Sequence, residues 1–300
     1  MPKPPFIVKD LIKDTETITR GLSQLGYVAD EELATILFLM LRLGKPLLLE
    51  GHPGVGKTEV ANVLAAYLNT DIIRLQCYEG LDVNSAVYEW NYQKQLLSIK
   101  IQEATDKTEA EKEAHIFGEE FLLKRPLLQS ITQPKRAPVL LIDEIDRADE
   151  EFEAFLLELL SAFQISIPEL GTIKAVHRPL VVLTSNRTRE LSDALKRRCL
   201  YHWVHFPDEG KERRIVQKHL PDIEEQLLTR VIRAVQAIRQ QKLEKTPGIA
   251  ETLDWVQGLQ ALGFKELTEE AMAKSLGCLL KSAKDIERVK AEGLEALTEP

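Results

Sequence analysis

The segment PLLLEGHPGVGKT, from Pro46 to Thr58, constrains the fold of this 300-residue chain more than any other stretch. The apolar run Pro46–Leu49 is typical of a buried parallel strand. It leads into GHPGVGKT, which satisfies the pattern GxxxxGK[ST], and the apolar residues of Glu59–Leu68 then recur at helical spacing. Such a pattern also occurs by chance in surface loops. Here the flanking strand and helix favour a phosphate-binding loop.

The residue types of this loop suit a nucleoside triphosphate. Glycines let backbone N–H groups turn toward phosphate oxygens, and the N-terminus of the following helix adds positive partial charge. We expect Lys57 to contact the β- and γ-phosphates of ATP and the Thr58 hydroxyl to bind Mg²⁺. The residues predicted to contact the nucleotide are Gly51, His52, Pro53, Gly54, Val55, Gly56, Lys57, Thr58 and Glu59.

A second motif, VLLIDEID, places Asp143 and Glu144 directly after the apolar run Val139–Ile142. A phosphate-loop ATPase needs such carboxylates downstream of its loop. Asp143 would hold Mg²⁺, and Glu144 would activate the attacking water as a general base. The alternative is a capped turn, since acidic residues often precede helices. The intact loop upstream favours the catalytic interpretation.

Further apolar runs predict strands at Ile72–Gln76, Leu180–Thr184 and Tyr201–Phe206. The fold class is therefore α/β, with a parallel sheet of five strands between helices. Residues 77–138 exceed what one crossover helix uses, so we predict an insertion at about 77–128. Its charged run at 106–113 is interpreted as a solvated helix face or loop.

Two segments follow the carboxylate motif. Apolar residues from Phe152 to Phe163 recur at i, i+3 and i+4 and predict a core helix. The carboxylates expected to face away from that core are Glu150, Glu151, Glu153 and Glu158. Residues 164–176 alternate around a turn and predict a β-hairpin, which would be either a substrate contact or a structural flap.

From Pro207 onward the strand-like runs cease and helical patterns follow at 211–220, 223–243, 250–262 and 268–286. We therefore predict two domains, an α/β nucleotide-binding domain at 1–206 and an all-helical domain at 207–300. This number agrees with the usual relation between chain length and domain count.

Composition narrows the function classes. The net charge of −8 gives no support to nucleic-acid binding. Three widely spaced cysteines predict reduced thiols in the cytoplasm, and the N-terminus has no signal-peptide pattern. No apolar run approaches the roughly 20 residues of a membrane span. His202 and His205, three apart on a predicted strand, would point to opposite faces, so we expect no metal site there.

Taken together, GHPGVGKT, VLLIDEID, LTSN and the Arg pair in SDALKRRC resemble the AAA+ ATPase superfamily. The insertion and the hairpin resemble its MoxR group. LQCYEGLDVNSAVYEWNYQKQLL, RPLLQSI and DEIDRADEEFEAFLLELLSAFQISIPELGTI resemble the CoxD-like branch, which is associated with maturation of molybdenum-dependent carbon monoxide dehydrogenase. The resemblance implies an AAA+ phosphate-loop core followed by a helical lid.

The resemblance also assigns residue roles. Asn186 corresponds to sensor 1, and Arg198 corresponds to the arginine finger that enters the nucleotide site of an adjacent subunit. Cys199 replaces the aromatic residue that usually follows the finger. Arg197 stays an alternative, as does a solvated helix end. At Thr252 the sequence departs from the family, because many relatives have a sensor 2 Arg at the matching position.

The sequence thus predicts a cytoplasmic Mg-ATP hydrolase that forms a ring, usually a hexamer, and remodels a client metalloenzyme such as a molybdenum hydroxylase. A von Willebrand A domain protein is the partner that the resemblance implies. A motor acting on nucleic acid and a non-hydrolysing nucleotide-dependent scaffold are the alternatives. The client, the ring size and any association with the inner face of a membrane stay open.

Overall fold

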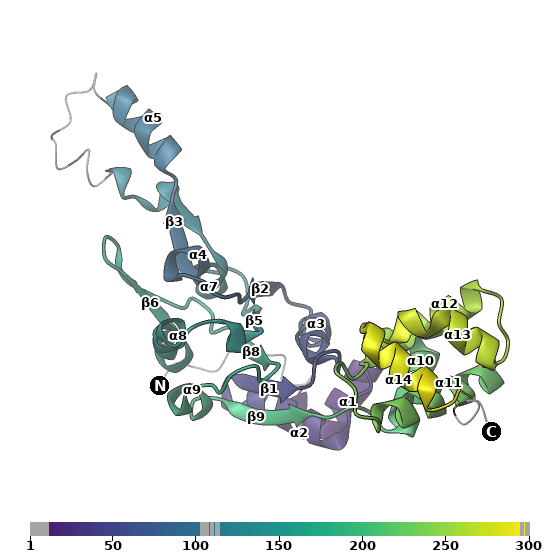
Figure 1. Cartoon of the computed structure of the whole chain (residues 1–300). Helices are drawn as coiled ribbons and strands as arrows, with labels where there is room; N and C mark the ends of the chain where they lie inside the picture. The colour runs from purple at the N-terminus through teal and green to yellow at the C-terminus, as the bar shows by residue number, and fades with distance from the viewer. Residues whose placement is uncertain (1–11, 103–107, 109–110, 112–114, 295–296, 298–300) are drawn as a thin grey trace. The chain divides into compact units, whose positions relative to one another are not determined.

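The computed structural model describes residues 12–102, 108, 111, 115–294 and 297 of the chain (Figure 1). The chain divides into two compact units. The first unit comprises the described parts of Met1–Ile18, Glu31–Glu50 and Ala61–His202. The second comprises Thr19–Asp30, Gly51–Val60 and the described parts of Trp203–Pro300. The phosphate-loop segment belongs to the second unit.

A parallel sheet of five strands, in the order β2-β5-β8-β1-β9, is the centre of the α/β fold. Its strands are β1 (Leu47–Gly51), β2 (Ile72–Gln76), β5 (Val139–Asp143), β8 (Leu180–Ser185) and β9 (Leu200–Val204). All residues of β1, β5 and β8 are buried, which explains their continuous apolar runs. Because β1 and β5 both pair with β8 in parallel, the carboxyl ends of these three strands lie at one edge of the sheet.

The helix after the carboxylate motif, α8 (Glu150–Ala162), packs its apolar residues into the main core of the first unit. The Asp149 carboxylate caps it by accepting the Phe152 N–H at 2.8 Å. One sequence prediction about this helix is wrong. Glu153 does not face solvent but is buried, with an ion pair to Arg189 and a hydrogen bond from the Ser192 N–H. A buried carboxylate is tolerated here because a neighbouring loop supplies its partners.

The described residues between β2 and β5 form several short elements beyond one crossover helix. These are α4 (Val83–Val87), β3 (Tyr88–Trp90), α5 (Tyr92–Gln102), the 3-10 turn η2 (Glu119–Phe121), β4 (Leu122–Lys124) and α7 (Pro126–Ile131). Strands β3 and β4 pair antiparallel. Strands β6 (Gln164–Ile167) and β7 (Gly171–Lys174) form the hairpin after α8 (Figure 1). Most of the charged run at 106–113 lies outside the described residues.

The remaining elements are helices and one further 3-10 turn. They are α1 (Thr15–Gln24), α2 (Glu31–Leu43), α3 (Lys57–Tyr67), η3 (Ile145–Arg147), α9 (Asp193–Lys196), α10 (Glu209–His219), α11 (Glu225–Arg239), α12 (Ile249–Ala261), α13 (Glu269–Leu279) and α14 (Ala283–Ala291). None of the helices in the described ranges is long and apolar enough to cross a membrane.

Helices α10–α14 share a second hydrophobic core, which surrounds the buried indole of Trp255. The single helix predicted at 268–286 is two helices instead. Leu280 ends α13 with extended backbone dihedrals, φ −103° and ψ 130°. The Leu280 side chain is buried at that bend. The break therefore directs this apolar side chain into the core, whereas a continuous helix would place it on another face.

Candidate functional site

The phosphate loop connects β1 to α3, in the order that the sequence predicts. Gly54 and Gly56 have φ values of +77° and +90°, a region that side chains with a Cβ rarely adopt. Helix α3 begins at Lys57, so Thr58 and Glu59 lie in its first turn. The loop therefore presents a helix N-terminus together with glycines at the two positions where the backbone needs them.

Lys57 is buried and holds the loop closed. Its ammonium group donates hydrogen bonds of 2.7 Å each to the carbonyl oxygens of Gly51 and His52. An ammonium fixed above backbone carbonyls places a positive charge inside the loop. A positively charged group of this kind attracts the negatively charged phosphates of a triphosphate.

The second unit supports this loop through contacts that sequence reasoning missed. The backbone N–H of Ile249 donates to the Gly54 carbonyl oxygen at 2.9 Å. The neighbouring Gly248 lies so close that a Cβ there would be 2.6 Å from the Gly54 Cα. The His52 ring stacks on Phe206 at 5.1 Å between centroids. The PGI segment at 247–249 signals a turn, but nothing in its composition reveals that it packs on the phosphate loop.

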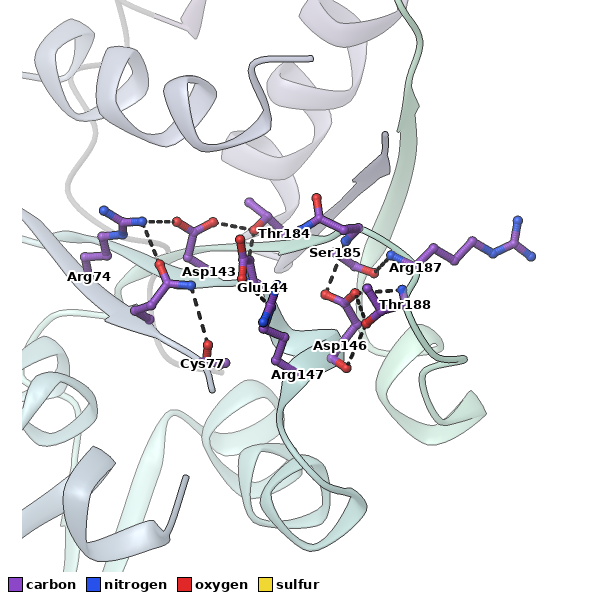
Figure 2. Close-up of polar contacts among 12 residues, drawn as sticks. Arg74, Cys77, Asp143, Glu144, Asp146, Arg147, Thr184, Ser185, Arg187 and Thr188 are labelled. Atoms are coloured by element: carbon purple, nitrogen blue, oxygen red, sulfur yellow. Dashed lines mark hydrogen bonds and ion pairs between the residues drawn. The ribbon is translucent and has the colours of Figure 1, made fainter. Parts of the chain in front are cut away.

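Asp143 and Glu144, at the end of β5, belong to the first unit and are joined by Thr184 of β8 (Figure 2). The Thr184 hydroxyl donates to Asp143 Oδ1 at 2.5 Å and accepts the Glu144 N–H at 2.9 Å. The other Asp143 oxygen accepts a hydrogen bond of 2.6 Å from Arg74. Both oxygens of this buried carboxylate are thus engaged. Thr184 and Arg74 are functional candidates that the sequence reasoning did not single out.

Glu144 has the left-handed backbone conformation, with φ 54° and ψ 50°. A non-glycine residue in this region is uncommon and is often found at functional sites. Its carboxylate forms an ion pair of 2.7 Å with Arg147, three residues later, and is one-third exposed. The predicted general base is accordingly near solvent, while Asp143 beside it is buried.

Asp146 joins the end of β5 to the loop after β8. Its carboxylate accepts the backbone N–H groups of Asn186 and Thr188 and the Thr188 hydroxyl, at 3.2, 2.8 and 2.7 Å. Burial alone would raise the pKa of Asp146, but these hydrogen bonds to the charged form hold the pKa below its usual value. The backbone of Asn186, the predicted sensor 1, is thereby held beside the end of β5.

The short helix α9 ends at Lys196, Arg197 is its C-cap, and Arg198 follows. The Arg198 guanidinium donates to Ser161 Oγ at 2.6 Å and to the Ala194 carbonyl oxygen at 2.8 Å. Arg197 is exposed at the C-cap of α9. Within the first unit, the two arginines therefore differ: one is positioned by α8, and the other points to solvent.

Thr252, at the position where relatives have a sensor 2 Arg, is fully buried. Its hydroxyl donates to Glu212 Oε1 at 2.8 Å. Glu212 also receives two hydrogen bonds from Arg239, at 2.6 and 2.7 Å, and Arg239 donates to the Pro247 carbonyl oxygen at 2.8 Å. The Arg239 guanidinium lies over the Phe206 ring. A buried network thus occupies this place and supports both the start of α12 and the ring that stacks on His52.

The two predicted metal ligands are oxygen donors, which suit Mg²⁺ better than a softer metal. Thr58 and Asp143 offer a hydroxyl and a carboxylate, the hard oxygen ligands that Mg²⁺ takes together with phosphate and water. Among the described residues there is no group of three or more His, Cys, Asp or Glu side chains arranged to hold an ion.

The three cysteines form no disulfide. Burial and nearby carboxylates raise the pKa of the Cys77 thiol to about 12.

Comparison with solved structures finds similarity to the Thermotoga maritima RuvB Holliday junction branch migration motor. The TM-score is 0.44 at 18% identity, over 91% of this chain and 70% of that one. A mutant of that RuvB has a TM-score of 0.48 at 19% identity, over 95% of this chain and 81% of the mutant's chain.

Among curated proteins, an uncharacterized protein of Staphylococcus aureus is 31% identical over 172 residues, which are 55% of this chain. The chain thus spans 57% of that relative's length. The sequence pattern of the AAA domain family, dynein-related subfamily, matches residues 46–199. That range contains the phosphate loop, the carboxylate pair, Asn186 and both arginines. The chain belongs to the AAA domain family, in its dynein-related subfamily, and has the AAA+ phosphate-loop fold.

Proposed function

We propose that the protein is a Mg-ATP hydrolase. The observation that carries this proposal is the placement of the two motifs in the sheet. Strands β1 and β5 both pair with β8 in parallel. The phosphate loop that follows β1 and the carboxylates that end β5 thus start from the same sheet edge, the place where α/β proteins bind nucleotides.

Each residue has a defined role in this proposal. Lys57 neutralises phosphate charge, and Thr58 and Asp143 hold the Mg²⁺, which adds further positive charge at the phosphates when bound. Glu144 takes the proton of the attacking water, and Asn186 orients that water. Arg198 of a neighbouring subunit stabilises the transition state, which makes a ring the working assembly.

The chain's proposed task is to remodel a client metalloenzyme, with a von Willebrand A domain protein as partner. Support comes from the long central stretches that resemble the MoxR group and its CoxD-like branch. A nucleic-acid motor is the second candidate, since RuvB is named a Holliday junction branch migration motor. The net charge of −8 weighs against it, because binding to nucleic acid is carried largely by cationic side chains.

The decisive experiment measures phosphate release from Mg-ATP by the wild-type protein and by Lys57→Ala. Lys45→Ala is the matched control, because Lys45 is an exposed lysine just before β1. Hydrolysis that persists in the control and is lost in Lys57→Ala supports the proposal. Equal rates in all three proteins would exclude it. Stimulation of hydrolysis by duplex DNA, weakened by added salt, would favour the nucleic-acid motor.

A further inference from the structure

A cavity of about 420 Å³ lies in the first unit, and none of its lining residues belongs to the phosphate loop or the carboxylate motif. Most of its wall comes from one stretch of chain, which runs through α4 and β3 to the first residue of α5. The turn between β6 and β7 supplies Glu169. Two segments about 80 residues apart in the sequence thus form one site. Figure 1 shows the β6 hairpin beside α4 and β3.

The described residues that line the cavity combine carboxylates with aromatic rings and include no cationic side chain. The side chains that define its chemistry are Asp82, Glu89, Glu169, Tyr88, Trp90 and Tyr92. Carboxylates attract a cation by charge, and the faces of aromatic rings attract it through their quadrupoles. The same wall repels phosphate groups, so the cavity does not suit a nucleic-acid backbone.

The three carboxylates differ in how far they are already engaged. Glu89 forms an ion pair of 2.5 Å with Arg125, and Asp82 accepts the Ser85 N–H at 2.6 Å as the cap of α4. Glu169 is exposed and makes no hydrogen bond or ion pair within the described part of the chain. Glu169 is therefore the carboxylate with most capacity for a new cationic partner.

Two of the aromatic rings in the wall come from one strand. Tyr88 and Trp90 lie two residues apart on β3, hence on one face of the strand. Their ring planes meet at 78°, in an edge-to-face contact with centroids 6.0 Å apart. Burial, and then the negative charge of Glu169, raise the pKa of Tyr88. Burial disfavours charge of either sign, but the contribution of Glu169 agrees with a carboxylate close enough to Tyr88 to act on it.

The surface next to the cavity indicates the kind of molecule that carries the cation. Tyr92 lines the cavity and is the first residue of α5. Further along α5, the side chains of Leu96, Leu97 and Ile101 are each at least 60% exposed. Exposed apolar side chains on a helix that begins in the cavity wall suit contact with another polypeptide. A small free cation would make no contact with these apolar side chains.

We propose that this cavity binds a lysine or arginine side chain of a partner polypeptide that docks along α5. This inference rests on the proposed function, because it gives the chemistry by which a client or partner protein is recognised. It joins the insertion and the hairpin, which the sequence analysis left without a specific ligand, into one recognition site.

The test uses a fluorescein-labelled peptide of alternating lysine and leucine, compared with the same peptide carrying norleucine in place of lysine. Binding is followed by fluorescence anisotropy with the full-length protein, without nucleotide, at about 0.15 M salt, where distant surface charges are screened. We expect the lysine peptide to bind wild-type protein at least ~10-fold more tightly, a difference of about 1.4 kcal/mol. Equal binding of the two peptides, or no binding of either, would overturn the inference.

Variants locate the site. Glu169→Gln and Tyr92→Ala change exposed side chains, and each should weaken binding about 5-fold, within the range of a cation–π contact or an exposed ion pair. Glu151→Gln, on the exposed side of α8, should bind as wild type does. Retained binding in both cavity variants would contradict the site.

Two competitors identify the occupant. Free lysine amide should displace the peptide only at far higher concentration, and single-stranded DNA should not displace it. Efficient displacement by lysine amide would make the ligand a small cation, and displacement by DNA would make this a nucleic-acid surface. Either result would overturn the inference. Because binding is measured without nucleotide, its failure is distinct from a failure of ATP hydrolysis.

Discussion

Arg74 donates a hydrogen bond of 2.6 Å to Asp143, the carboxylate proposed to hold Mg²⁺. The two residues belong to neighbouring strands, since Gln76 of β2 is in register with Asp143 of β5. Arg74, two residues earlier, is on the same face of the strand as Gln76. The second Asp143 oxygen is taken by Thr184. A cation of the protein itself thus engages the carboxylate that the proposed Mg²⁺ would need.

Replacement of Arg74 by Met should therefore make Mg²⁺ easier to bind. The Arg74 side chain is 54% exposed, so its ion pair contributes about 1 kcal/mol or less, equivalent to roughly a fivefold change. We expect the Mg²⁺ concentration for half-maximal binding of a fluorescent ADP analogue to fall by up to that factor. Arg214→Met, at an exposed arginine of α10, is the control. An unchanged or higher Mg²⁺ requirement would show that Arg74 does not compete with the metal.

If Arg198 acts in a neighbouring subunit, two inactive variants should restore each other. Arg198→Ala keeps Glu144, and Glu144→Gln keeps Arg198, so statistical mixing gives about a quarter of the sites both groups. Each variant alone should be at least ~100-fold slower than wild type. The phosphate-release rate of the mixture should clearly exceed that of either variant alone. A mixture as inactive as its components argues against a finger acting between subunits.

Arg197→Ala is the matched variant for this experiment. Arg197 is exposed and lies beside Arg198, so its loss should leave hydrolysis near the wild-type rate if Arg198 is the finger. The reverse outcome, with Arg198→Ala active and Arg197→Ala inactive, would reassign the role to Arg197.

The buried pair of Arg239 and Glu212 should dominate the stability of the C-terminal helices. Their side chains are 4% and 0% exposed, so Arg239→Met leaves an uncompensated carboxylate and should cost about 3–5 kcal/mol. Thr252→Val removes one hydrogen bond to the same carboxylate and should cost about 1.5–3 kcal/mol. Urea unfolding followed by the fluorescence of tryptophans, which include the buried Trp255, measures both. Lys274→Met, at an exposed ion pair on α13, should unfold as wild type does. If Arg239→Met also unfolds as wild type does, the buried network does not stabilise the C-terminal helices.

Asp146 should make stability depend on pH at the acid end. Its pKa is lower in the folded protein than in the unfolded chain, so its contribution is present above the unfolded value and is lost as pH falls through the folded value. Asp146→Asn should therefore be less stable than wild type at pH 7, by roughly 1 kcal/mol. The difference should shrink below about pH 4. Urea unfolding from pH 7 to pH 3 tests this, and a constant difference would contradict it.

The sheet and the two nucleotide motifs could be predicted because they depend on local patterns. Buried parallel strands appear as unbroken apolar runs, and the glycines of the phosphate loop are needed where φ is positive. For example, every residue of β8 (Leu180–Ser185) is buried, and its sequence predicts a strand at Leu180–Thr184, one residue shorter.

What the sequence could not predict depends on contacts between distant segments. Glu153 follows the pattern of a solvent-facing residue, and only the nearby Arg189 and Ser192 make its burial tolerable. Thr184 links the two carboxylates, but in the sequence it is only a polar residue that follows the apolar run Leu180–Leu183. The contact of Gly248 with Gly54 likewise joins residues almost 200 positions apart. Periodicity carries no information on such pairings.

The most direct test of the central claim compares nucleotide binding and turnover in Glu144→Gln. The substitution keeps the shape of the side chain and removes its ability to accept a proton. We predict that the variant binds a fluorescent ATP analogue with wild-type affinity and releases phosphate at least ~100-fold more slowly. Turnover at the wild-type rate would contradict the assignment of Glu144 as the general base and, with it, the proposed hydrolytic site.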